Sequence, residues 1–226
     1  MTPVDGAWVV VVPVKDPARG KSRLDAPGVD RIALARAIAL DALAAVAACD
    51  EVARVVVVTD DAAMPMHAAG IAGVRWIDET AAREHRAAEA IAGRADSVFA
   101  AGLDGAIAAG MAEVDDAMPR AALLGDLPAL RPDELAVALR EAASVPRGVA
   151  ADAEGTGSTL VTAGAGVAWA SSFGDGSFAR HLALGCVPLA TTDAPTLHRD
   201  VDTIDQLEAA RTLGLGPRTT AVLERG

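Results

Sequence analysis

The chain has 226 residues, a formal net charge of −11, 52% hydrophobic residues, and three tryptophans and three phenylalanines as its only aromatic residues. The negative charge disfavours nucleic-acid polymers and anionic membranes as partners, and Cys49 and Cys186 are too few for a disulfide framework or a zinc site. With no signal-peptide pattern and no uncharged apolar run of about 18 residues, we expect a soluble, cytoplasmic protein. No linker rich in proline or serine divides the chain, so we expect one domain over residues 1–226.

Short β-branched runs alternate with alanine-rich segments along the chain. This alternation is typical of βαβ units and predicts an α/β fold with a mainly parallel sheet. The predicted strands are Trp8–Val14, Arg54–Thr59, Val74–Ile77, Ala121–Gly125, Gly148–Ala151, Leu160–Ala163 and Val187–Ala190. The predicted helices are Arg31–Ala48 with Asp30 as its N-cap, Ala62–Ala69, Gly105–Ala112, Pro132–Ala143, Ser177–Leu184 and Ile204–Leu213. Residues 80–102 fit either a helix or a mobile flap.

The only two lysines of the chain lie close together after the first predicted strand. They are Lys15 and Lys21, and the other Lys/Arg positions are all arginine. A cationic loop at the carboxyl end of a parallel strand is a natural phosphate site, and Gly20 lets backbone amides approach an anion. The segment ends in Gly-Lys-Ser as a Walker A loop does, but Lys15 stands where that motif needs glycine, which excludes a P-loop. A solvated mixed-charge loop is the alternative.

A second cluster follows the strand predicted at Ala121–Gly125. Asp126 comes directly after that strand and is followed by Leu127 and Pro128. An aspartate at the carboxyl end of a strand lies where open α/β sheets bind ligands, and its carboxylate is an oxygen ligand suited to Mg²⁺. The alternative is that Asp126 only begins a turn before the helix at Pro132.

A third cluster spans residues 199–203 and contains two further carboxylates. If this segment is an extended strand, alternation directs Asp200 and Asp202 to the same side. Asp202 is alternatively the N-cap of the helix that begins near Ile204. Because Mg²⁺ usually takes one or two protein carboxylates and completes its shell with water and phosphates, Asp126 with Asp200 would suffice.

Two glycine-rich segments carry hydroxyl groups. Residues 155–159 and 173–177 offer backbone amides and O–H donors to a small anion, and Ser177 begins a predicted helix. Ordinary turns have the same composition, so each segment alone predicts little. Within that helix we expect His181 to be structural or at the surface rather than catalytic.

The sequence contains no Ser-His-Asp, Cys-His or HExxH arrangement. One reaction that needs none is attack by a substrate phosphate on the α-phosphate of a nucleoside triphosphate, because the nucleophile arrives already ionised. Catalysis then consists of alignment and of charge neutralisation. Mg²⁺ at Asp126 and Asp200, and the cations of Lys15, Lys21 and Arg23, would supply these parts.

Five motifs follow one another along the chain: PVKxxxxGKSRL from Pro13, LLGDLPAL from Leu123, GTGST from Gly155, FGxGS from Phe173 and RDVDT from Arg199. Together they resemble the phosphoenolpyruvate/2-phospholactate guanylyltransferase family of deazaflavin coenzyme F-420 biosynthesis, over nearly the whole chain. The resemblance implies a Rossmann-like, three-layer domain of the nucleotide-diphospho-sugar transferase type. It also implies that GTP and a three-carbon phosphorylated acid give a guanosine diphosphate adduct and pyrophosphate.

The resemblance also implies roles for individual residues. Leu103-Asp104 stands where the family carries Leu-Asn, so the residues that read guanine are not predicted. The implied residues are Asp126 and Asp200 for Mg²⁺, with Asp202 close by; Ser158 or Thr159, Gly174 and Ser177 for the three-carbon acid; and Lys15, Lys21 and Arg23 for the nucleotide triphosphate.

Composition bears on the choice of acid. The alanine- and arginine-rich chain resembles high-GC actinobacterial members, whose acid is phosphoenolpyruvate, so we expect GTP and phosphoenolpyruvate, with 2-phospho-L-lactate as the alternative. A sugar 1-phosphate or molybdenum-cofactor nucleotidyltransferase is disfavoured because the usual first loop with an Arg-Met element is absent. A non-catalytic nucleotide-binding module is disfavoured by three aspartates in two motifs. The oligomeric state is not predicted.

Overall fold

The first strand, β1 (Trp8–Val14), lies in the middle of the sheet, and all of its residues are buried. We describe the protein from a computed structural model, which covers residues 8–19, 21, 23–24, 26–84 and 102–226. Burial on both faces explains the uninterrupted apolar sequence of β1, because a strand covered by helices on both sides has no solvent-facing positions. The predicted strand is therefore confirmed.

Within the described residues, the sheet has seven strands in the order β3-β2-β1-β4-β6-β5-β7. Four strand pairs are parallel, whereas β6 runs antiparallel to both of its neighbours, β4 and β5. The strands after β1 are β2 (Val52–Thr59), β3 (Val74–Asp78), β4 (Arg120–Leu123), β5 (Arg147–Ala151), β6 (Ser158–Ala163) and β7 (Val187–Pro188). The predicted α/β fold with a mainly parallel sheet is confirmed, with β4 and β7 ending earlier than predicted.

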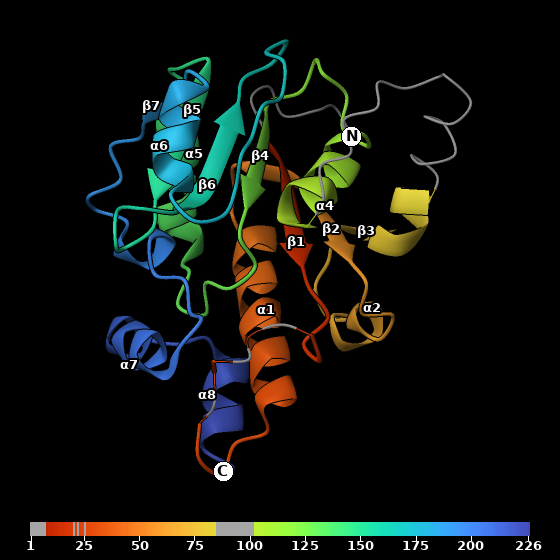
Figure 1. Ribbon diagram of the computed structural model, residues 1–226, viewed down its shortest axis with the longest axis vertical. Coiled ribbons are helices and arrows are strands. Elements are labelled where there is room, and N and C mark those ends of the chain that lie inside the picture. Colours follow the sequence, from red (N-terminus) through yellow and green to blue (C-terminus); the bar gives the residue numbers. More distant parts are fainter. Residues whose placement is uncertain (1–7, 20, 22, 25, 85–101) are drawn as a thin grey trace.

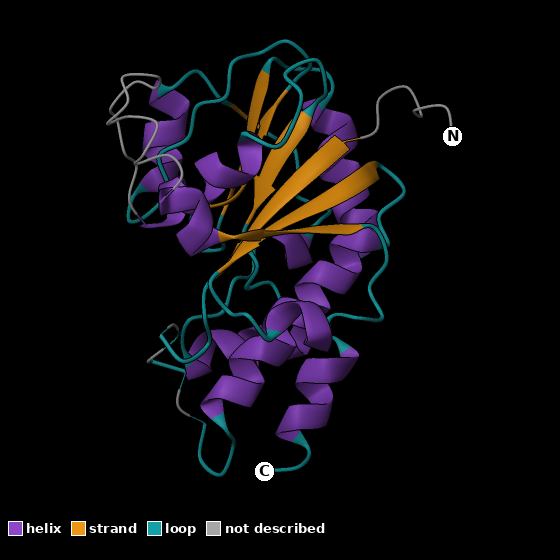
Figure 2. Ribbon diagram, turned by 90° about the vertical axis from the view of Figure 1, so that its right-hand side faces the viewer, coloured by secondary structure: helices purple, strands orange, loops and turns teal. Residues whose placement is uncertain are grey.

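Helices cover both faces of the sheet (Figures 1 and 2). One face packs against α1 (Arg31–Ala47), α2 (Met64–His67) and α5 (Pro132–Ala142). The opposite face packs against α4 (Gly102–Met111) and α6 (Ser177–Ala183). Alternate residues of β1 enter the two cores, so that the three layers follow from the two-residue period of the strand.

The remaining helical elements lie towards the end of the chain. They are the short 3-10 helix η1 (Pro195–Leu197), α7 (Ile204–Leu213) and α8 (Pro217–Leu223). Helices α7 and α8 share a separate apolar cluster with the first turns of α1. None of the helices within the described ranges is both long and apolar enough to cross a membrane.

Local signals place some helix boundaries well and others poorly. Asp30 caps α1 as predicted, because its carboxylate accepts hydrogen bonds from the amides of Ile32 and Ala33. Helix α2 is shorter than predicted, and α8 was not predicted. Of the unassigned range 80–102, residues 80–84 are helical, Gly102 begins α4, and the rest lies outside the described residues.

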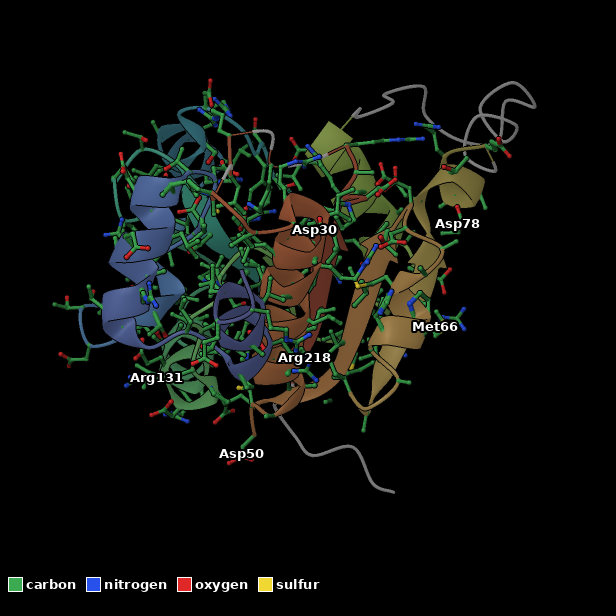
Figure 3. All side chains as sticks on the ribbon, turned by 90° about the horizontal axis from the view of Figure 1, so that it is seen from below. Asp30, Asp50, Met66, Asp78, Arg131 and Arg218 are labelled. Carbon is green, nitrogen blue, oxygen red and sulfur yellow. The ribbon has the colours of Figure 1, made fainter. Side chains whose placement is uncertain are left out.

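Helix α8 is fixed to α1 by one buried carboxylate. Asp41, within α1, accepts hydrogen bonds from the amides of Arg218 (3.1 Å) and Thr219 (2.7 Å) in the first turn of α8. A Cβ atom at Gly216 would lie 2.3 Å from Asp41 Cγ, so this approach requires glycine. Figure 3 shows Arg218 where α8 runs beside α1.

We expect Asp41→Ala to lower the free energy of unfolding by about 2–3 kcal/mol, because it leaves one buried and one partly buried amide without acceptors. Asp41→Asn, which keeps one acceptor oxygen, should cost less. Urea unfolding followed by circular dichroism measures both changes. Equal stability of Asp41→Ala and the parent protein would show that this contact does not hold α8.

Candidate active site

A cleft of about 590 Å³ opens at the carboxyl ends of β1 and β4. Pro13 and Val14 come from the end of β1, and Gly125 and Asp126 follow β4. This is the edge at which open α/β sheets bind ligands. The predicted site residues that line the cleft are Lys15, Lys21, Asp126, Ser158, Gly174, Ser177, Asp200 and Asp202.

The reversed strand β6 explains why a hydroxyl joins this edge. Because β6 runs antiparallel to β4, its first residue, Ser158, lies near the carboxyl end of β4, where Leu123 pairs with Leu160. The loop that precedes β6 is held by Asp152, whose carboxylate accepts the amides of Thr156 (2.9 Å) and Gly157 (2.7 Å). One segment therefore brings both a carboxylate and a hydroxyl to the cleft.

The structure distinguishes Ser158 from Thr159, the two hydroxyl residues that the sequence offered as alternatives. Ser158 and Thr159 are adjacent in β6, so they face opposite sides of the sheet. Ser158 lines the cleft, whereas Thr159 is fully buried and its hydroxyl lies 3.5 Å from the carbonyl oxygen of Ala151. Thr159 therefore lies outside the cleft, and of these two residues Ser158 is the one that lines it.

Lys21 joins two of the predicted metal ligands. Its ammonium group donates to Asp126 Oδ2 at 2.9 Å, to Asp202 Oδ1 at 3.0 Å and to the carbonyl oxygen of Val201. Lys21 also has a φ of 53°, alone among the non-glycine residues that the structure describes, so the loop accepts left-handed strain at this position. The sequence assigned Lys21 to the triphosphate and these aspartates to Mg²⁺ as separate groups, whereas here they are in direct contact.

Charge explains this contact. Burial by itself would lower the pKa of Lys21, but the carboxylates of Asp126 and Asp202 outweigh it, so the pKa is raised and the group stays charged. Arg23, the third predicted cation, is largely exposed and lies 3.7 Å from Asp202, outside the cleft lining. Lys15 lines the cleft and is exposed, without a salt bridge to any described residue.

Asp200 is the carboxylate that Lys21 does not neutralise. Burial, followed by the negative charges of Asp126 and Asp152, raises its pKa from 3.8 to about 7. One carboxylate oxygen of Asp200 and one of Asp126 are buried without a hydrogen-bond partner in the described part of the chain. Two orphaned, hard oxygen donors in an acidic cleft are a suitable pair for Mg²⁺.

A preformed cage of three carboxylates is not observed. Within residues 8–84 and 102–226, apart from the gaps at 20, 22 and 25, no group of three or more His, Cys, Asp or Glu side chains is placed to enclose a metal ion. The ammonium of Lys21 lies between Asp126 and Asp202, which keeps Asp202 from forming such a group with the other two. The arrangement fits a site that takes two carboxylates and completes its shell with water and phosphate.

The interpretation of residues 199–203 as a strand is wrong. They form no strand, and Thr203 rather than Asp202 is the N-cap of α7. Thr203 accepts the amide of Gln206, and the Gln206 side chain accepts the Thr203 amide in return. Asp202 therefore does not cap α7. Its carboxylate instead accepts a hydrogen bond from Lys21.

The segment 171–177 forms the opposite wall, and residues that the sequence did not single out for this role hold it. Asp104, in the first turn of α4, accepts hydrogen bonds from the Ser171 hydroxyl and the Phe173 amide. Arg180 donates to the carbonyl oxygens of Ser172, Phe173 and Asp175. These contacts set the positions of Gly174 and Ser177, which line the cleft. The sequence had singled out Asp104 only because it stands where the resembling family carries asparagine.

His181 is buried, so the expectation of a position at the surface is wrong. It is fully buried, and its ring packs edge-on against Phe173 at a centroid distance of 4.8 Å. Its two ring nitrogens contact Ser158 Oγ (2.9 Å) and the amide of Ser172 (3.0 Å). One ring thus connects the two glycine-rich segments of the cleft.

Comparison with known proteins identifies the family. No family model matches the chain. The chain is 43% identical over 222 residues to the phosphoenolpyruvate guanylyltransferase of Thermomonospora curvata, covering 96% of this chain and 89% of that protein. It is also 43% identical over 223 residues to the enzyme of the same name from Streptomyces scabiei, with 96% of both chains covered. The chain belongs to the phosphoenolpyruvate guanylyltransferase family. It is therefore a nucleotidyltransferase, as the five motifs indicated.

Solved structures share the fold of this phosphoenolpyruvate guanylyltransferase family member at low sequence identity. A homologue of the Mycobacterium tuberculosis protein Rv0371c, from Mycobacterium sp. strain JC1, has a TM-score of 0.55 at 19% identity and covers 97% of this chain and 98% of its own. The 4-diphosphocytidyl-2C-methyl-D-erythritol synthase of Anaerococcus prevotii has a TM-score of 0.54 at 8% identity, covering 92% and 96%. The predicted nucleotide-diphospho-sugar transferase type of fold is confirmed.

We expect the raised pKa of Asp200 to make the protein less stable as pH rises. Between pH 3.8 and about 7 the folded protein holds a proton that the unfolded chain has lost, so the free energy of unfolding falls across this range. In chelator-treated buffer, Asp200→Asn should be more stable than the parent by about 1–3 kcal/mol at pH 8 and by roughly a third of that at pH 5. Urea unfolding at both pH values measures this, and a difference independent of pH would contradict it.

Proposed function

We propose that this protein transfers GMP from GTP to phosphoenolpyruvate, giving enolpyruvyl-diphospho-guanosine and pyrophosphate, as a step of coenzyme F-420 biosynthesis. The observation that carries the proposal is the 43% identity over 96% of the chain to enzymes named phosphoenolpyruvate guanylyltransferase. The cleft supports it, because cations, carboxylates and hydroxyl-bearing loops from all five motifs line one space.

The reaction requires no side chain as nucleophile. A phosphate oxygen of phosphoenolpyruvate forms a bond to the α-phosphorus of GTP, and the bond from that phosphorus to the oxygen bridging to the β-phosphate breaks. The electron pair of the broken bond leaves with pyrophosphate. Since the attacking phosphate is already ionised at neutral pH, the protein contributes orientation and charge neutralisation rather than a general base.

Orientation and charge neutralisation would come from the cations and carboxylates of the cleft. Lys15 is exposed at the cleft, so its ammonium group is available to the triphosphate. Asp126 and Asp200, with Asp202 beside them, would hold Mg²⁺, which neutralises charge on phosphate oxygens when bound. Lys21 neutralises Asp126 and Asp202 and would lie next to the phosphates that this Mg²⁺ contacts.

The part of the cleft formed by the two glycine-rich segments is suited to the three-carbon acid. Ser158, Gly174 and Ser177 line it and offer hydroxyls and backbone amides to carboxylate and phosphate oxygens. The relatives are named for phosphoenolpyruvate, which favours this acid over 2-phospho-L-lactate. We place the reaction in the cytoplasm, since Cys49 and Cys186 are both free and buried and the chain needs no oxidising compartment.

A steady-state assay of pyrophosphate release tests the function. Purified protein is supplied with GTP, Mg²⁺ and either phosphoenolpyruvate or 2-phospho-L-lactate, and with ATP, CTP or UTP in place of GTP as controls. Release that depends on GTP and phosphoenolpyruvate together is the expected result. Faster turnover with 2-phospho-L-lactate would change the substrate, and no release with either acid would refute the proposal.

We expect Asp126→Asn to reduce kcat by about 100-fold or more while the protein stays folded, because one charged contact at the reacting phosphate is lost. The matched control is Asp133→Asn, an aspartate in the first turn of α5 that does not line the cleft. Pyrophosphate release and circular dichroism measure activity and folding. Unchanged turnover of Asp126→Asn would rule out its metal role.

We expect Lys21→Ala to raise KM for GTP or to lower kcat by about tenfold or more, because the triphosphate loses a neighbouring cation and Asp126 and Asp202 lose their partner. Arg23→Ala, which removes an exposed cation of the same loop, should have a smaller effect. Steady-state kinetics with each substrate varied in turn measures this. Normal use of GTP together with a changed preference between the two acids would place Lys21 in the other half of the site.

A further inference from the structure

The hydrogen bonds of His181 determine which of its ring nitrogens carries the proton. The ring is fully buried, and burial is the main reason that its pKa falls to about 4, so it is neutral at physiological pH. A neutral imidazole carries one N–H and one acceptor nitrogen. The backbone amide of Ser172 can only donate, and it lies 3.0 Å from Nε2. Nε2 is therefore the acceptor, and the proton is on Nδ1.

This tautomer fixes the direction of the hydrogen bond to Ser158. Nδ1–H donates to Ser158 Oγ at 2.9 Å, so the serine oxygen accepts from the ring. The hydroxyl proton of Ser158 cannot point back at a nitrogen that is already protonated. No other side-chain hydrogen bond of Ser158 occurs among the residues that the structure describes. The proton is thus left to point into the cleft that Ser158 lines.

We propose that His181 is a positioning residue that turns the Ser158 hydroxyl into a fixed hydrogen-bond donor for an anionic oxygen of the three-carbon acid. The inference rests on the proposed function, since it names how that substrate is held. The oxygen belongs to the carboxylate or the phosphate of the acid, which are the two anionic groups it offers. A hydroxyl that is free to act as acceptor would repel either group, so fixing its direction favours the acid over a neutral ligand.

The ring also has a second connection, and this gives a competing explanation to test. By accepting the Ser172 amide, His181 supports the segment that carries Gly174 and Ser177. If this support were its only role, the Ser158 contact would not matter for substrate binding. The two roles use different nitrogens, so different substitutions separate them.

Two amide substitutions at His181 distinguish its contact with Ser158 from its contact with Ser172. The side-chain amide of His181→Asn reaches about the position of Nδ1 and keeps a donor for Ser158, whereas His181→Gln reaches about the position of Nε2 and keeps an acceptor for Ser172. We expect His181→Gln and Ser158→Ala to raise KM for phosphoenolpyruvate about tenfold or more, the size expected for one hydrogen bond to a charged group. His181→Asn should raise it about threefold or less, and KM for GTP should change little in all three variants.

The opposite order, with His181→Gln better than His181→Asn, would show that support of the 171–177 segment is the only role. Equal effects on KM for GTP and for phosphoenolpyruvate would also overturn the inference. The double variant His181→Gln/Ser158→Ala should be no worse than Ser158→Ala alone, because both changes remove the same contact.

A measurement on the unmodified protein keeps the inference testable if a variant fails to fold. Nitrogen-15 NMR of the histidine-labelled full chain distinguishes a protonated Nδ1 from a protonated Nε2, and the His181→Asn spectrum assigns the signal. Protonated Nδ1 is the expected result, and protonated Nε2 overturns the inference directly. If the parent protein releases no pyrophosphate with phosphoenolpyruvate, the proposed function fails, whereas the tautomer still tests the Ser158 contact on its own.

Discussion

The cleft depends on holding negative charges close together at one edge of the sheet. Asp126 follows β4 and Asp202 precedes α7, and they are kept near each other by the ammonium of Lys21. No cation among the described residues compensates Asp200 in this way, and burial raises its pKa. Keeping this carboxylate ionised in the folded protein therefore costs free energy. Buried carboxylates with perturbed pKa values cluster at functional sites, where a substrate or an ion can complete the arrangement of charges.

Several of these features could be predicted because the signals are local. The apolar run of β1, the cap at Asp30 and the aspartate after β4 each follow from a few adjacent residues. The reversal of β6 could not be predicted, since strand sequences alternate in the same way in parallel and antiparallel pairs. The contact of Lys21 with Asp126 spans 105 positions and has no local signal. For α7 a signal existed: Gln206, three residues after Thr203, marks the cap that was assigned to Asp202.

The fold and the chemistry are shared at different evolutionary distances. Solved structures at 8% and 19% identity share the overall fold, whereas the relatives at 43% identity carry the name of one reaction. A sheet edge of this kind accepts many substrates, and selection among them rests on the loops beyond the strands. In this chain those loops are held by hydrogen bonds to Asp104, Asp152, Arg180 and His181.

The contact between α1 and α8 has a consequence for the order in which the chain assembles during synthesis. Asp41 emerges from the ribosome 177 positions before Arg218, whose amide it accepts. At rates of about 5–20 residues per second, roughly 10–35 s pass before that partner exists. Until then the carboxylate lacks the two amides through which α8 is fixed to α1. Helix α7 and Val201, beside the cleft, pack on the same end of α1. The apolar cluster that α1 shares with α7 and α8 is therefore completed late in synthesis.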